Sequence, residues 1–90
     1  MAHVAFTRHL QRFFPSLTEC EVPAATVREV IVELDRLHPG LASYLVDETG
    51  RLRRHVNIFV GEEPIYDRTA LTDPVTPDAR VFILQALSGG

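Results

Sequence analysis

The segment TVREVIVELDRL, residues 26–37, has the clearest helical spacing in this 90-residue chain, and it limits what the chain can fold into. Its apolar residues recur at intervals of three and four, as on one face of a helix. They are Val27, Val30, Ile31, Leu34 and Leu37. Thr26 precedes this run and Glu29 follows three residues later, which is the pattern of a capping box. We therefore predict a helix over residues 27–37, ended by the His-Pro-Gly sequence at 38–40.

The residues on both sides of this helix show the alternation of strands. Before the helix we predict strands at residues 3–10 and 18–22, paired as an antiparallel hairpin. After it we predict a further half-turn at 41–45, a strand at 51–60, a short edge strand at 65–66, a loop at 67–78 and a last strand at 80–87. The last strand is nearly all apolar, which is typical of a central strand covered on both faces. Two strands, one helix and then more strands predict an α+β fold, a mixed four- to five-stranded sheet with one main helix packed across it.

Size and composition predict one soluble domain, residues 1–87, with a flexible Gly-Gly tail at 88–90. The net charge of −3 does not favour binding to nucleic acid. The chain has no long apolar segment that would span a membrane, and its first residues lack a secretory pattern, so we expect a cytoplasmic protein.

The cysteine and histidine residues do not predict a metal centre or a disulfide. Cys20 is the single cysteine, so no internal disulfide forms, and a lone cysteine is usually a small buried hydrophobe. The four histidines lie in separate predicted elements and lack the spacing of metal ligands. They are His3, His9, His38 and His55.

The chain ends in Ser88, Gly89 and Gly90, directly after the last apolar strand. Glycine has no Cβ, so such a tail can thread a narrow channel and let another backbone approach closely. Three extended residues reach about 10 Å, and the terminal carboxyl group is ionised at neutral pH. The tail therefore suits a reactive carboxylate carried on a short tether. The alternative interpretation is that it is simply a solvated chain end.

Several features in this order resemble the MoaD/ThiS family of sulfur carriers, whose fold is the ubiquitin-like β-grasp. They are the helix that begins at Thr26, the stop at residues 39–41, the strand sequence GRLRRHVNIFV at 50–60 and the final RVFILQALSGG at 80–90. The sequence departs from the family at Gly61-Glu62-Glu63, where Asn-Gly is frequent. It also has Gln85 and Ala86 where prolines often precede the tail, so the choice of partner stays open.

The resemblance implies that the chain is a protein co-substrate rather than an enzyme, with no bound cofactor. The Gly90 carboxylate would attack ATP at the α-phosphate, and a sulfide or persulfide donor would displace AMP to leave a thiocarboxylate. The implied partners are an adenylating enzyme of the ubiquitin-activating type, which uses the ATP, and a sulfur-accepting biosynthetic enzyme. The acceptor stays open between molybdopterin, thiazole, cysteine and a thiolated natural product.

Apolar residues near the tail are candidates for a partner-binding surface, because an exposed apolar patch marks a protein-binding site. These candidates are Phe59, Phe82, Leu84 and Leu87. Arg53 and Arg54 stand in a short basic cluster and would meet an acidic partner surface, or else form a solvated face.

Three other functions fit the same pattern. The chain could be the small subunit of molybdopterin synthase in a stable complex, or a ubiquitin-like modifier that forms isopeptide bonds with other proteins. It could also be a β-grasp binding module whose tail has no function.

Overall fold

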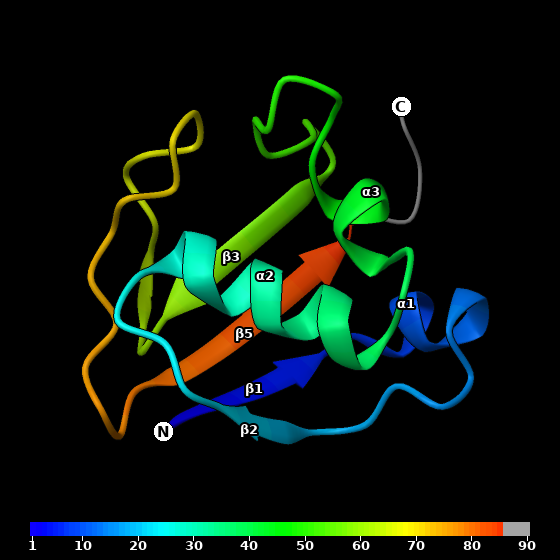
Figure 1. Cartoon of the computed structure of the whole chain (residues 1–90), viewed down its shortest axis with the longest axis horizontal. Helices are drawn as coiled ribbons and strands as arrows, with labels where there is room; N and C mark the ends of the chain where they lie inside the picture. Colours follow the sequence, from blue (N-terminus) through cyan, green and yellow to red (C-terminus); the bar gives the residue numbers. More distant parts are fainter. Residues whose placement is uncertain (86–90) are drawn as a thin grey trace.

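The computed structural model describes residues 1–85, and of His9 only the backbone. Its sheet contains five strands in the order β2-β1-β5-β3-β4 (Figure 1). The strands are β1 (Ala2–Phe6), β2 (Cys20–Val22), β3 (Val56–Val60), β4 (Glu63–Pro64) and β5 (Arg80–Gln85). β1 and β5 run parallel, whereas the other neighbours are antiparallel. The mixed sheet predicted from the sequence is confirmed, with β5 at its centre.

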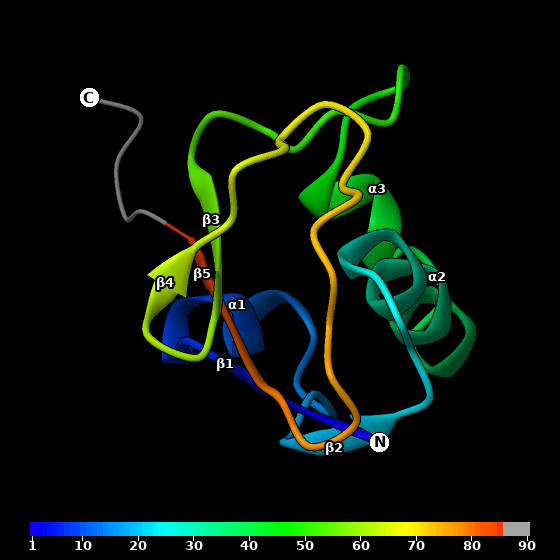
Figure 2. The ribbon, with the colours of Figure 1, turned by 90° about the vertical axis from the view of Figure 1, so that its left-hand side faces the viewer.

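Helix α2 (Val27–Leu37) packs across one face of this sheet, as predicted, and α3 (Leu41–Leu45) follows it directly. Figure 2 shows both helices on the same side of the sheet. The inward side chains of the three central strands meet the apolar face of α2 and form the core. They include Val4, Val56, Ile58, Val81 and Ile83 from the strands, with Val27, Val30, Ile31 and Leu34 from the helix.

The Thr26 cap of α2 forms as the sequence indicates, while the Glu29 side chain reaches back one residue beyond the cap, to Ala25. The Thr26 hydroxyl accepts a hydrogen bond from the Glu29 N–H at 3.3 Å, and the Glu29 carboxylate accepts one from the Ala25 N–H at 2.6 Å. Gly40 follows the helix with a φ of 100°, a backbone conformation that glycine adopts without strain. The ends of α2 are therefore fixed by local sequence.

We expect Thr26→Ala to lower the free energy of unfolding by about 1 kcal/mol, because the Glu29 N–H loses its capping acceptor. Urea unfolding followed by circular dichroism measures the change. Thr18→Ala is the control, since Thr18 is exposed and lies outside the helices and strands. Equal losses in the two variants would contradict a capping role.

The first predicted strand is wrong beyond its sixth residue. The strand ends at Phe6, and residues 8–13 form a short helix, α1 (Arg8–Phe13), which places Leu10 in the core. A helix of six residues is too short to display a hydrophobic period, so the alternation that continues from β1 is misleading. β1 and β2 are antiparallel neighbours, as predicted, and the connection between them contains α1 before the loop.

Two other strand boundaries differ from the prediction. Residues 51–55 do not extend β3, because the Leu52 and Arg53 N–H groups bond to the carbonyls of Arg68 and Leu45. The short edge strand was predicted at 65–66 but lies at 63–64. Residues 63–64 pair with the end of β3. β5 is central, but its outer face is not covered, since Phe82 is 38% exposed.

The loop between β4 and β5 is organised by carboxylates. Asp67 accepts hydrogen bonds from the Thr72 hydroxyl and from the N–H groups of Thr69, Ala70 and Thr72. These bonds, led by the one from the Thr72 hydroxyl, hold the pKa of Asp67 well below its usual range. Asp73 accepts from the N–H groups of Tyr66 and Asp67. The segment predicted as loop is therefore a loop with defined internal bonds.

Candidate functional site

The predicted reactive tail follows the central strand of the sheet. Gln85 is the last described residue and ends β5, where it lies opposite Val56 of β3. Leu87, Ser88, Gly89 and Gly90 lie outside the described residues, so the roles predicted for them stay predictions. The described structure therefore ends on the central strand of the sheet, three residues before Ser88 in the sequence.

The face of the sheet away from α2 carries three of the predicted partner-binding residues. Side chains alternate along a strand, and Val81 and Ile83 of β5 are buried under the helix. Phe82 and Leu84 therefore point to the opposite face, where Phe59 of β3 lies directly across from Phe82. The structure brings these three apolar residues together on what we call the open face.

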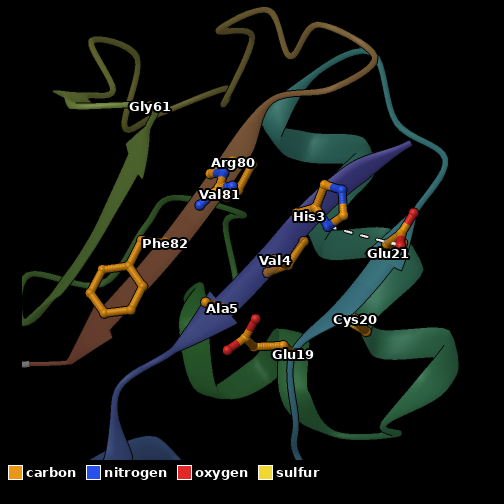
Figure 3. Close-up of a pocket in the computed structure, with 10 residues that line it drawn as sticks. All are labelled: His3, Val4, Ala5, Glu19, Cys20, Glu21, Gly61, Arg80, Val81 and Phe82. Atoms are coloured by element: carbon orange, nitrogen blue, oxygen red, sulfur yellow. Dashed lines mark ion pairs between the residues drawn. The ribbon is translucent and has the colours of Figure 1, made fainter.

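A groove of about 620 Å³ lies on the same face, over β1, β2 and the first half of β5 (Figure 3). Ala5 and Phe82 are apolar lining residues that point outward, and Val4 and Val81 also line it although their side chains are buried on the helix side. Its charged lining residues are Glu19 and Glu21 on the β2 side and Arg80 on β5, and the His3 imidazole on β1 also lines it. His3 Nδ1 and a Glu21 carboxylate oxygen are 3.9 Å apart across the β1–β2 pair. The open face therefore combines an apolar floor with charges of both signs, as protein-binding surfaces do.

Cys20 also lines this groove, and it is half-buried. Burial raises the pKa of its thiol, so the reactive thiolate is scarcer at neutral pH than in an unfolded chain. We expect iodoacetamide to alkylate Cys20 more slowly in the native protein than in urea at pH 7, and the native rate should keep rising with pH after the rate in urea has levelled off. Intact mass against time measures both rates. A faster reaction in the native protein would show that Cys20 is an activated thiol.

The two predicted basic residues lie apart from the groove. Arg53 donates two hydrogen bonds to the Ser43 carbonyl, at 3.1 and 3.0 Å, and therefore sits beside α3. It lines a second, smaller cavity with Ser43, Tyr44 and His55. Arg54 is exposed. The contact of either arginine with an acidic partner surface stays a prediction.

We call Gln85, the last described residue, the base of the tail. It lies near side chains that no sequence pattern had linked to the tail. Gln85 Nε2 donates a hydrogen bond to the Tyr44 hydroxyl at 3.3 Å. The Tyr44 ring contacts Phe14 edge-on, with ring centroids 5.7 Å apart, and Phe13 at a tilt, with centroids 5.1 Å apart. These residues come from α3, β5 and the chain at the end of α1, so no local pattern could have linked them. The sequence also did not predict the groove. Strand alternation does place the outward residues of β1 and β2 on one face, and this was the available signal.

Neither a metal site nor a membrane span is found in the described part of the chain. Among those residues, no group of three His, Cys, Asp or Glu side chains is placed to hold a metal ion. No helix within residues 1–85 has the length and apolar character needed to cross a bilayer.

Comparison with known proteins gives a consistent result. No protein-family model matches the chain. The sulfur carrier protein CysO of Mycobacterium tuberculosis is 33% identical over 67 residues, which is 72% of each chain. Its crystal structure superposes with a TM-score of 0.82, at 25% identity over 97% of this chain and 100% of that one.

Two further structures have the same fold. The crystal structure of an Amycolatopsis orientalis BexX/CysO complex matches with a TM-score of 0.84, at 27% identity over 100% of both chains. The small archaeal modifier protein 1 of Methanosarcina acetivorans matches with a TM-score of 0.79, over 99% of this chain and 95% of that one. At 19% identity it supports the fold alone. The predicted ubiquitin-like β-grasp fold is confirmed.

Proposed function

The chain belongs to the family of CysO-like sulfur carrier proteins, and from this premise we propose that Gly90 is the residue that carries the sulfur. The supporting observation is where the described chain ends. Gln85 ends β5, the central strand of the sheet, and Ser88-Gly89-Gly90 begins three residues later in the sequence. A rigid body with a short glycine tail can present a carboxylate deep inside a partner while the body stays outside.

The proposed reaction has two steps. First, a carboxylate oxygen of Gly90 attacks the α-phosphorus of ATP, and pyrophosphate leaves, which gives an acyl-adenylate. Second, sulfide attacks the acyl carbon, the bond to the AMP oxygen breaks, and a thiocarboxylate and AMP remain. ATP is a substrate of the partner enzyme in this scheme. This chain supplies the carboxylate and the surface that brings it to the enzyme, so it acts as a co-substrate rather than as a catalyst.

We propose two protein partners for the carrier. The first is an ATP-using adenylating enzyme of the ubiquitin-activating type, and the second is a biosynthetic enzyme that accepts the sulfur. The existence of a BexX/CysO complex supports binding to a partner protein in this family. The likeness to CysO favours cysteine biosynthesis as the destination of the sulfur. ATP-dependent loading of this kind would take place in the cytoplasm, and the scheme involves neither nucleic acid nor a membrane.

The open face is the proposed contact surface for these partners. Phe82, Phe59 and Leu84 form its apolar part. The charged residues of the groove would fix the orientation of a bound partner. Leu87, Arg53 and Arg54 are proposed to extend the contact along the tail and beside α3. An apolar centre with charged surroundings is the usual anatomy of a protein interface.

An intact mass of the untagged protein, purified from its own host, tests the proposal. We expect a species in which one oxygen is replaced by sulfur, and fragmentation should place the change at Gly90. A mass that stays unmodified after incubation with ATP, sulfide and the host's adenylating enzyme would contradict the proposal. Adducts that join Gly90 to lysines of other proteins would favour a modifier, and a stable co-purifying large subunit would favour a synthase complex.

A further inference from the structure

Tyr44 makes a side-chain contact with the last described residue of β5. The hydrogen bond from Gln85 Nε2 to the Tyr44 hydroxyl joins residues that are 41 positions apart in the sequence. It connects α3, on the helix side of the sheet, to the point from which the tail continues. No other side-chain hydrogen bond within the described residues involves Gln85.

This contact lies where the backbone support of β5 becomes weaker. β1 pairs with β5 as far as Ile83, whose carbonyl accepts a bond from the Thr7 N–H, and then turns away into α1. Leu84 and Gln85 lie opposite residues of β3 alone. A strand end with one neighbour opens more readily than the strand centre. The bond to Tyr44 therefore holds Gln85 at the position where ladder pairing on the β1 side has stopped.

The Tyr44 ring is itself fixed by aromatic neighbours. Phe14 contacts it edge-on and Phe13 contacts it at a tilt, and such pairs are favourable arrangements of aromatic rings. Tyr44 is half-buried and packs against the core. The hydroxyl thus has a defined position before it meets Gln85.

The side-chain amide of Gln85 lowers the stability of the fold if its only role is to fill space. Its Oε1 is buried and has no hydrogen-bond partner among residues 1–85. A buried amide atom without a partner is unfavourable, whereas an apolar side chain of similar size would carry no such cost. What the amide adds is a directional bond.

We propose that Tyr44 and Gln85 form a clamp that fixes the direction in which the tail leaves β5. Both act as positioning residues for the reaction at Gly90, so this inference rests on the proposed function. The reacting carboxylate must reach a near-attack distance in the enzyme, and misplacement of about 1 Å lowers a rate about 100-fold. A clamp at the base of the tail removes conformations in which Gly90 is aimed elsewhere.

The variant Tyr44→Phe tests the clamp, because it removes the hydroxyl and keeps the aromatic contacts. Tyr66→Phe is the matched control, since Tyr66 is 87% exposed. We expect the kcat of Gly90 adenylation to fall about 5- to 30-fold in Tyr44→Phe, which corresponds to freeing about one backbone residue. The KM for the carrier should stay close to that of Tyr66→Phe, whereas the thermal midpoint should fall by a few degrees because Gln85 Nε2 loses its acceptor. Gln85→Leu should lower kcat similarly, and the double variant should lose no more than either single variant.

A second measurement needs no partner enzyme. The side-chain amide of Gln85, which donates to the Tyr44 hydroxyl, should exchange its hydrogens faster in isolated Tyr44→Phe than in the Tyr66→Phe control. A native kcat in Tyr44→Phe would overturn the clamp and leave the proposed function intact. If the unmutated protein is never adenylated, the proposed function fails instead. The exchange rate of Gln85 then decides the clamp alone, and an unchanged rate overturns it.

Discussion

One alanine added after Gly90 is expected to lower the rate of adenylate formation at least about 100-fold. The added residue moves the terminal carboxylate by about 3.5 Å along the tail and converts the Gly90 carboxylate into an unreactive amide. A displacement of 1 Å from near-attack geometry already costs about 100-fold. Deleting Gly90 displaces the carboxylate by the same length in the other direction and should be equally damaging. Pyrophosphate release or ATP–pyrophosphate exchange with the purified adenylating enzyme measures the effect.

The fold provides the control for these tail variants. The core residues in the described part of the chain all precede Gln85, so we expect the extended and shortened chains to unfold at the same temperature as the parent protein. Intact mass at the end of each assay shows whether a protease has removed the added alanine. An extended chain that keeps both its full mass and a native rate would show that the terminal carboxylate is not the nucleophile.

The parts of the fold that the sequence predicted correctly depend on local patterns. The capping box at Thr26 and the spacing of Val30 and Leu34 place α2 at its observed limits, because both signals act within a few residues. The alternation of Val56, Ile58 and Val60 also predicts the inner face of β3. In these segments the hydrophobic period and the tertiary burial agree.

The errors occur where tertiary bonds override a local pattern. Residues 51–55 look like a continuation of β3, but the N–H groups of Leu52 and Arg53 bond to a distant loop and to α3. The helix α1 is short, and the burial of Leu10 stabilises it more than any repeating pattern does. No single-sequence rule anticipates such long-range partners.

The candidate site divides in the same way. The tail and the three apolar residues of the open face were identified from the sequence, because glycine chemistry and strand alternation are local. The register that sets Phe59 across from Phe82 is a property of the folded sheet. The bond between Tyr44 and Gln85 also depends on the arrangement of α3 and β5. Sequence reasoning thus predicts the reactive group, while the structure is needed to find the residues that we propose to orient it.

Phe82→Ala is expected to weaken binding to the adenylating enzyme about 30-fold, which corresponds to about 2 kcal/mol at an interface hot spot. Phe82 is 38% exposed at the centre of the open face, with Phe59 beside it and the groove at its edge. A large aromatic side chain in such a place is the type of residue that dominates interface energies. Isothermal titration calorimetry measures the Kd.

Val32→Ala is the control for this variant, because Val32 is 58% exposed on α2, the helix that covers the other face of the sheet. Its Kd should equal that of the parent protein. The Phe82 variant should raise the Kd and KM with little change in kcat, whereas Tyr44→Phe should lower kcat at constant KM. These opposite patterns follow from the two tasks that we propose, binding of the enzyme by the open face and aiming of the carboxylate by Tyr44 and Gln85. An equal Kd for the Phe82 and Val32 variants would place the docking surface elsewhere on the molecule.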